Sequence, residues 1–264
     1  MTSRPDLGAP GKIAVALSLT AVGGYVDAIG YIALFEVFTA NMSGNSVHIG
    51  MFLGQWNWLQ LRRPACAVLS YVVGMLLTRI TVGIAGRKGI RRIASFTLAV
   101  EALLLLLFAR ATPAMHVGQV VDLESPQYFT LVALLAFAMG VQTATLTHIG
   151  PLTVYTTFVT GTLTKMTESF TRVLFWAYDQ LRQTGIPDIV RLAPKHADVQ
   201  EGTMLAATWI CYVLGAAIGT VMKLKWELRA LYLPVALLIV FIVVDLCRPI
   251  DVEEEKHQTG QVQH

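Results

Sequence analysis

Charge is scarce in this sequence of 264 residues, because only 14% of them are Asp, Glu, Lys or Arg. A soluble domain carries about 25% charged residues. One soluble core of this size cannot hide a chain that is 55% hydrophobic, with a mean hydropathy of +0.58. The composition therefore excludes a disordered chain, a collagen and a soluble enzyme, and it predicts a polytopic membrane protein.

Charge of one sign is not concentrated in any stripe. The net charge is only +3, and the basic residues lie between apolar runs, so we expect no nucleic-acid partner. Cysteine is also rare, and Cys66, Cys211 and Cys247 form no CxxC pair and no Cys/His spacing. This excludes a secreted disulfide scaffold, and we interpret the three cysteines as small apolar residues in helix packing.

Motifs of known enzyme classes are missing. The sequence has no Walker A motif, dinucleotide fingerprint, HExxH or GxSxG. We therefore predict no enzyme, no ATP-driven pump within the chain and no cofactor. His48 and His148 have no third ligand at a suitable spacing, so no metal site is predicted.

Long apolar runs are what the sequence does contain. A helix needs about 20 mostly apolar residues to cross a bilayer. Six runs reach that length well or nearly, over residues 13–34, 65–86, 93–110, 128–149, 203–222 and 230–247. Two further segments, 37–54 and 154–176, are semi-apolar and rich in Gly, Ser, Thr and Asn. We predict an all-α polytopic transmembrane helix bundle over 13–247, with six clear spans and two broken motif helices. A polar arm (1–12) and a polar tail (248–264) flank it.

The two halves of the bundle, 13–110 and 128–247, look alike. Each has a Tyr-x-x-Gly sequence in a corresponding run, at 71–74 and at 212–215. Each also has a hydroxyl residue, a glycine and a short polar residue upstream of that run. These triplets are Ser43-Gly44-Asn45 and Thr160-Gly161-Thr162. Matches in the same order predict an internal repeat.

The number of crossings stays open. The short loops 86–92 and 223–229 are basic, whereas 111–127 carries acidic residues and no Lys or Arg. If the motif segments cross, there are eight crossings, the repeats are parallel and both basic loops are cytoplasmic. If the motif segments re-enter, there are six crossings, the repeats are inverted and the basic loops lie on opposite sides. The distribution of Lys and Arg favours eight. Residues 179–202 are predicted to be an extramembrane loop with at most a short helix.

Three strings resemble a known family. They are GYVDAIGY at 24–31, VFTANMSGN at 37–45 and YTTFVTGTLT at 155–164. The chain resembles the YoaK / DUF1275 family of integral membrane proteins over about residues 13 to 247, with Ser43-Gly44-Asn45 where the family pattern is Thr-Gly-Asn. The resemblance implies a membrane fold and location. It implies no activity and no site residues.

Two acids lie inside predicted spans. Asp27 stands two-thirds of the way along the first run, and Glu101 lies in the middle of 93–110. A charge at mid-bilayer costs about 2.5–3.5 kcal/mol, so each acid must face the bundle, carry a proton or find a partner. The partner could be Lys165, Arg79 or, through a shared proton, the other acid. The functional hypothesis assigns Asp27, Glu101 and Lys165 to ion or proton coupling. The alternative for Asp27 is a structural acid that binds backbone amides of the broken helix that follows.

Short polar residues crowd both motif segments. A glycine flanked by Asn, Ser or Thr relaxes or ends a helix, and matched broken helices in two halves point to a central transport site. The predicted substrate-binding residues are Asn41, Ser43, Gly44, Asn45, Thr160, Gly161 and Thr162. The alternative is close helix packing through small residues, which fits Gly50-x-x-x-Gly54 and Gly215-x-x-x-Gly219 better.

The sequence thus favours a small-solute secondary transporter or permease in the cell (plasma) membrane. Its partners would be the lipid bilayer, a small-molecule substrate and, through glycine-rich faces, a second copy of the chain. The competing interpretation is a non-transporting membrane scaffold, sensor or assembly partner, which needs the polar motifs only for packing.

Overall fold

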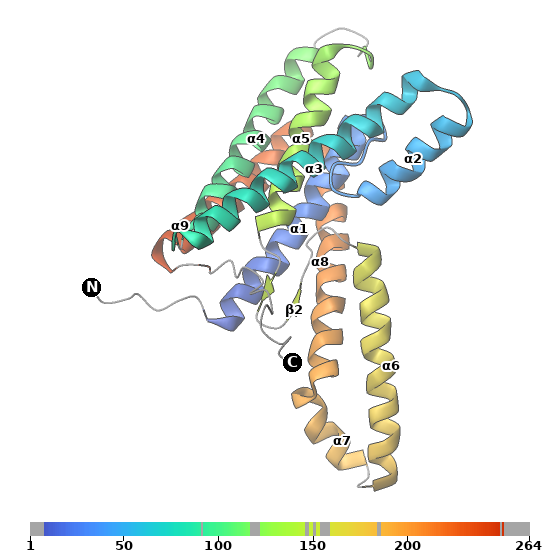
Figure 1. The fold of residues 1–264 in the computed structure, drawn as a ribbon, viewed down its shortest axis with the longest axis vertical. Helices are drawn as coiled ribbons and strands as arrows, with labels where there is room; N and C mark the ends of the chain where they lie inside the picture. Colours follow the sequence, from blue (N-terminus) through green and yellow to red (C-terminus); the bar gives the residue numbers. More distant parts are fainter. Residues whose placement is uncertain are drawn as a thin grey trace, which may run out of the picture.

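The computed structural model describes residues 8–90, 92–116, 122–145, 148–149, 152–153, 159–183, 186–248 and 250. The fold of these residues is helical, which confirms the predicted class (Figure 1). In chain order, the helices are α1 (Ala9–Ala33), α2 (Met42–Gly54), α3 (Trp58–Arg87), α4 (Ile93–His116), α5 (Pro126–Thr145), α6 (Val159–Gln183), α7 (Ile186–Leu192), α8 (Ala197–Trp226) and α9 (Tyr232–Cys247). Two 3-10 turns, η1 (Ala193–Lys195) and η2 (Glu227–Leu231), precede α8 and α9.

Helix α5 ends at Thr145, four residues before the end of the apolar run 128–149 that predicted it. After Thr145 the chain forms a minimal antiparallel hairpin of β1 (His148–Ile149) and β2 (Leu152–Thr153), with His148 opposite Thr153. The sequence Gly150-Pro151 between the two strands disfavours helix, which explains why an apolar run does not continue as one.

Five helical stretches among the described residues are long and apolar enough to cross a membrane. They are Pro10–Ala33, Trp58–Arg87, Ile93–Ala111, Pro126–Thr145 and Ala197–Cys247. The last contains two helices, α8 and α9, joined by η2. By contrast, the 13 residues of α2 rise only about 20 Å, less than the hydrocarbon thickness of about 30 Å.

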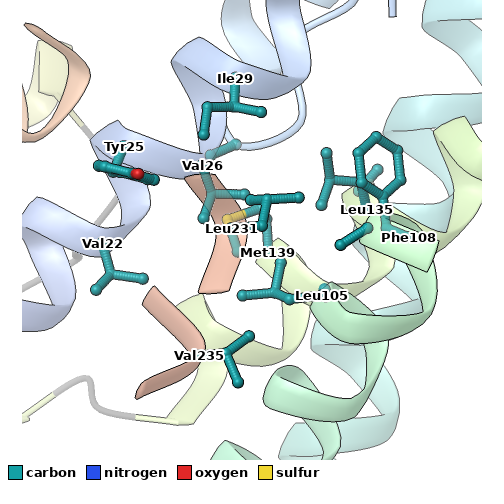
Figure 2. Packing of buried hydrophobic residues seen from close by; sticks show 14 of the residues in the cluster. Val22, Tyr25, Val26, Ile29, Leu105, Phe108, Leu135, Met139, Leu231 and Val235 are labelled. Carbon is teal, nitrogen blue, oxygen red and sulfur yellow. The ribbon is translucent and has the colours of Figure 1, made fainter. Parts of the chain in front are cut away.

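Helices α1 and α5 lie at the centre of the bundle. In their most apolar windows, 67% of the α1 residues and 72% of the α5 residues are buried, against 28% for α3. The outward face of α3 is apolar, with Leu69, Leu76 and Ile80 exposed. Such a face suits lipid rather than water. Between the central helices and their neighbours α4 and η2, side chains such as Val26, Leu105, Leu135, Met139 and Leu231 form the core (Figure 2).

Glycines let two pairs of helices cross in backbone contact. At the α1–α8 crossing, a Cβ on Gly24 would clash with the carbonyl oxygen of Tyr212, and one on Gly215 with that of Ala21. At the α3–α5 crossing, Gly140 lies in the same way against Tyr71, and Gly74 against Phe137. Gly219 likewise meets the backbone of Tyr25, so the predicted packing role of Gly215-x-x-x-Gly219 is confirmed. At Gly50 and Gly54 a methyl group would have no neighbour within 4 Å, so these two glycines make no such contact within the described chain.

Helix α6 packs along α8 and away from the central helices (Figure 1). Arg172 joins the two helices, with Nε 2.6 Å from Asp198 Oδ1 and a terminal nitrogen 2.8 Å from Glu201 Oε2. The hydrogen bond to Asp198 raises the pKa of the exposed Arg172 guanidinium. These polar contacts explain a difference from the expected loop at 179–202. Where the structure describes it, this stretch consists instead of the end of α6, of α7 and η1, and of the beginning of α8.

Candidate functional site

The break between α1 and α2 is organised around Asp27. Its Oδ1 accepts hydrogen bonds from the backbone amides of Thr39 and Ala40, both at 2.7 Å, and from the Thr39 hydroxyl at 3.2 Å. Its Oδ2 accepts one from the Tyr212 hydroxyl of α8 at 2.7 Å. The carboxylate is buried. These are the contacts that the structural alternative for Asp27 expected.

The turn that Asp27 holds is irregular. Helix α1 ends at Ala33, and Phe35 and Glu36 then take left-handed backbone angles, with φ of 52° and 69°. Such angles cost non-glycine residues about 1–3 kcal/mol each and persist only where the surrounding structure holds them. The Tyr128 hydroxyl of α5 donates to the Leu34 carbonyl at 2.7 Å, so protein groups satisfy both ends of the turn.

The first polar motif forms the N-terminal end of α2. Asn41 is the N-cap, and its side-chain oxygen accepts from the Ser43 hydroxyl at 2.7 Å and from the Gly44 amide at 3.4 Å. Asn45 is buried and pairs with the backbone of Phe38, donating to its carbonyl at 2.7 Å and accepting from its amide at 3.1 Å. Ser43 is exposed and Asn41 is half-buried. Among these residues, Ser43 and Asn41 are therefore the ones that a ligand could reach.

The second polar motif forms the N-terminal end of α6. Thr160 and Lys165 are exposed, Gly161 is half-buried and Thr162 is buried. The preceding part of the family string, 155–158, lies outside the described residues. Helix α2 packs on α3 and α6 packs on α8, and the two motif helices share no extensive interface in the part of the chain described.

Two tyrosines make similar bonds at the two glycine crossings. At the α1–α8 crossing Tyr212 donates to Asp27, three residues after Gly24. At the α3–α5 crossing the Tyr71 hydroxyl donates to the Thr143 hydroxyl at 2.9 Å, three residues after Gly140. In each case the tyrosine belongs to the Tyr-x-x-Gly sequence of one half, and its partner lies on the first helix of the other half.

Glu101 lies elsewhere, on α4, and is fully buried. Among the described residues, neither of its carboxyl oxygens has a hydrogen-bond partner. The structure therefore does not bring this carboxyl group into hydrogen-bond contact with Asp27, Lys165 or Arg79, the partners considered from the sequence.

Two buried polar residues were missed by the sequence analysis. Asp245 of α9 accepts from the Ser95 backbone amide at 2.9 Å, from the Ser95 hydroxyl, and from the Ile250 amide at 2.7 Å. Gln142 of α5 donates to the Leu19 carbonyl of α1 at 2.5 Å. The signal that marked Asp27 and Glu101, a polar residue within an apolar run, applies to both of them.

An open groove runs along the outer face of α6. The side chains that line it are Thr164, Thr167, Glu168, Thr171 and Arg172. It begins on the turn after Thr160 and Gly161. As for metals, the described residues contain no group of three His, Cys, Asp or Glu side chains that could hold an ion.

These features define a polytopic, helical integral membrane protein whose chain breaks inside the bundle at a turn held by Asp27 and Tyr128. The chain belongs to the DUF1275 family, whose description is a protein of unknown function and whose family model matches residues 15–244. It is 28% identical over 227 residues to the UPF0700 transmembrane protein YoaK of Bacillus subtilis (strain 168), covering 84% of this chain and 88% of the relative. No solved structure matches significantly. The resemblance noted from the sequence is thus confirmed, and the bilayer is the environment of the apolar faces.

Proposed function

We propose that this protein is a small-solute secondary transporter or permease of the cell membrane, with its substrate site at the N-terminal ends of α2 and α6. The observation that carries the proposal is the turn between α1 and α2, whose freed amides bind Asp27. Irregular backbone at membrane depth occurs where it is buried in protein or lines a wet cavity, and broken helices of this kind hold the substrate sites of secondary transporters.

The accessible residues of the two motifs would contact the substrate. Ser43 and Thr160 offer hydroxyls, and Asn41 offers an amide. The remaining predicted residues, Gly44, Asn45, Gly161 and Thr162, shape the helix ends. The exposed ammonium of Lys165 follows Thr160 by five residues and favours a substrate with an anionic group.

The acids inside the membrane domain are the groups that would couple proton binding to transport. Asp27 contacts both the turn before α2 and Tyr212 of α8, so a proton on Asp27 would weaken its hold on two elements at once. Glu101, buried without a hydrogen-bond partner among the described residues, is the second proton-binding group of the proposal.

An inverted repeat accounts for the paired crossings. Gly24-x-x-Asp27 with Tyr212-x-x-Gly215, and Gly140-x-x-Thr143 with Tyr71-x-x-Gly74, have the same spacing and the same donor. Each crossing joins one half to the other. Alternating access by rocking of two such halves is the mechanism known for transporters with inverted repeats.

The proposed topology has six crossings. Helix α2 is too short to cross alone, so it re-enters, and α6 takes the corresponding place in the second half. The basic loops 86–92 and 223–229 then lie on opposite sides of the membrane.

We include homo-oligomer formation in the proposal, because Gly50 and Gly54 leave an open face on α2. The proposed function includes no enzymatic reaction.

A scaffold or assembly partner is the second candidate. The observation that favours it is the use of Asn45 and Asp27 by the turn itself, which leaves few motif groups for a ligand.

Solute flux in proteoliposomes distinguishes the two candidates. Wild-type protein should carry at least one member of a panel of small polar and anionic metabolites, with a dependence on pH. Asp27→Asn should reduce that dependence, and Ser43→Val should weaken transport. Asp179→Asn, an exposed change on α6, is the control. Absence of flux for the whole panel favours the scaffold, and flux indifferent to both substitutions moves the site away from α2.

A further inference from the structure

Glu101 and Gln142 have buried side-chain oxygens that lack a hydrogen-bond partner among the described residues. Both side chains are fully buried. Neither carboxyl oxygen of Glu101, nor Oε1 of Gln142, has a hydrogen-bond partner within the described residues. Gln142 uses its amide nitrogen to donate to Leu19, so what it lacks is a donor. A protonated carboxylic acid supplies an O–H donor, which an ionised carboxylate lacks.

The two residues stand at the same level of neighbouring helices. Helices α4 and α5 are consecutive, pack together and run in opposite directions (Figure 1). Leu105 of α4 and Met139 of α5 lie in one core cluster (Figure 2). Glu101 precedes Leu105 by four residues and Gln142 follows Met139 by three. In antiparallel helices both steps lead one turn toward the same end.

The two helices that pack most closely on α4 offer no cation to an ionised Glu101. Two helices, α5 and α9, pack closely on α4, and neither contains Lys, Arg or His. Their titratable groups are Tyr128, Tyr232, Asp245 and Cys247, and Asp245 is already bonded to the amide and hydroxyl of α4 at position 95.

The other neighbours of Glu101 do carry charged residues. Arg110 of α4 itself, nine residues from Glu101, donates to the Tyr232 hydroxyl. Arg229 and Glu227 lie on η2, and α3, which touches α4 over a short stretch, carries Arg62, Arg63, Arg79 and Arg87. Among the described residues, none of these side chains makes a hydrogen bond to the Glu101 carboxyl group. An isolated carboxylate in such a place is expelled or neutralised.

We propose that Glu101 binds a proton between α4 and α5 and donates it to Oε1 of Gln142. The pair is an acid–amide hydrogen bond in the dry part of the bundle, separate from the turn at Asp27. Its existence does not depend on transport, whereas its use in coupling rests on the proposed function.

Infrared spectroscopy of the full chain in lipid tests the pair directly. The wild type should have a C=O stretching band of a protonated carboxylic acid at neutral pH. Glu101→Gln should lose that band and still fold, because a neutral carboxamide donates the same hydrogen bond. Gln142→Met, which keeps length and apolar character, should move the band to higher frequency. Asp245→Asn is the control that leaves it in place.

Each contrary result overturns the inference. A wild-type spectrum without this band, or a band that survives Glu101→Gln, shows that Glu101 does not hold the proton. A band unmoved by Gln142→Met, in protein with wild-type helix content by circular dichroism, shows that Gln142 is not its partner. If the band behaves as expected while flux is absent, the pair stands and the transport proposal falls.

Discussion

The side chain of Asp27 accepts hydrogen bonds from two separate parts of the chain. A single carboxylate accepts bonds from two backbone amides, one threonine hydroxyl and one tyrosine hydroxyl. Those donors belong to the turn before α2 and to α8. Asp27 therefore fixes the path of the chain and the position of a distant helix together, and any change of its charge is felt by both.

Removal of this carboxylate should cost stability. Asp27→Ala leaves two amides and two hydroxyls without an acceptor. We expect a loss of about 2–6 kcal/mol, since each buried unsatisfied group costs about 1–3 kcal/mol and the two amides, unlike the hydroxyls, cannot rotate toward another acceptor. Asp27→Asn keeps one acceptor oxygen and should cost about half as much. Reversible unfolding in detergent measures both, with Asp179→Asn as the neutral control. Equal stability of Asp27→Ala and wild type would contradict the role given to Asp27.

The sequence allows the buried acids to be predicted, but not the residues that form hydrogen bonds with them. Asp27 and Glu101 stand out because charge is rare inside apolar runs. Which donors reach Asp27 could not be predicted, because Tyr212 lies 185 positions away in the chain and only the glycine crossing brings it close. Gln142 carries no charge, so the sequence singles it out less clearly, although its burial constrains it as strongly.

Among the elements, α2 and the glycine crossings do most to position the site. The start of α2 was foreseeable from Asn41, a good N-cap followed by small polar residues. The end of α1 was not. Phe35 and Glu36 carry the left-handed turn that glycine normally makes, and their conformation is held by distant contacts at Asp27 and Leu34 rather than by local sequence.

The crossings yield a matched pair of substitutions. Gly24→Ala puts a methyl group against the Tyr212 carbonyl and should destabilise the protein by about 1–3 kcal/mol or more, because backbone cannot move aside cheaply. In monomeric protein in detergent, Gly50→Ala, on the open face of α2, should be neutral or stabilise by up to about 1 kcal/mol through helix propensity. Thermal unfolding of the two variants provides the comparison. A Gly24→Ala variant as stable as Gly50→Ala would mean that α1 and α8 do not touch at this crossing.

For the whole molecule, the length of α2 is the basis of the proposed six crossings. The distribution of Lys and Arg favoured eight crossings when only the sequence was considered, because helix length cannot be read from a semi-apolar segment such as 37–54. The structure assigns only 13 residues of that segment to helix. The residues consumed by the turn before α2 account for the difference.

Six crossings predict opposite sides for the two basic loops. In a variant without Cys66, Cys211 and Cys247, single cysteines at Gly89 and Lys225 should react with a membrane-impermeant thiol reagent from opposite faces of sealed vesicles. Labelling of both from the same face would favour eight crossings. Labelling after membrane solubilisation provides the control for reactivity.

The central claim is that the ends of α2 and α6 meet water inside the membrane domain. In the cysteine-free background, single cysteines at Ser43 and Thr160 should react with a small hydrophilic thiol reagent in intact vesicles. A cysteine at Leu69, which is 66% exposed on the outward apolar face of α3, should not. If the thiols at 43 and 160 are as unreactive as the one at 69, the motif helices end in a dry interior and the transporter proposal is contradicted.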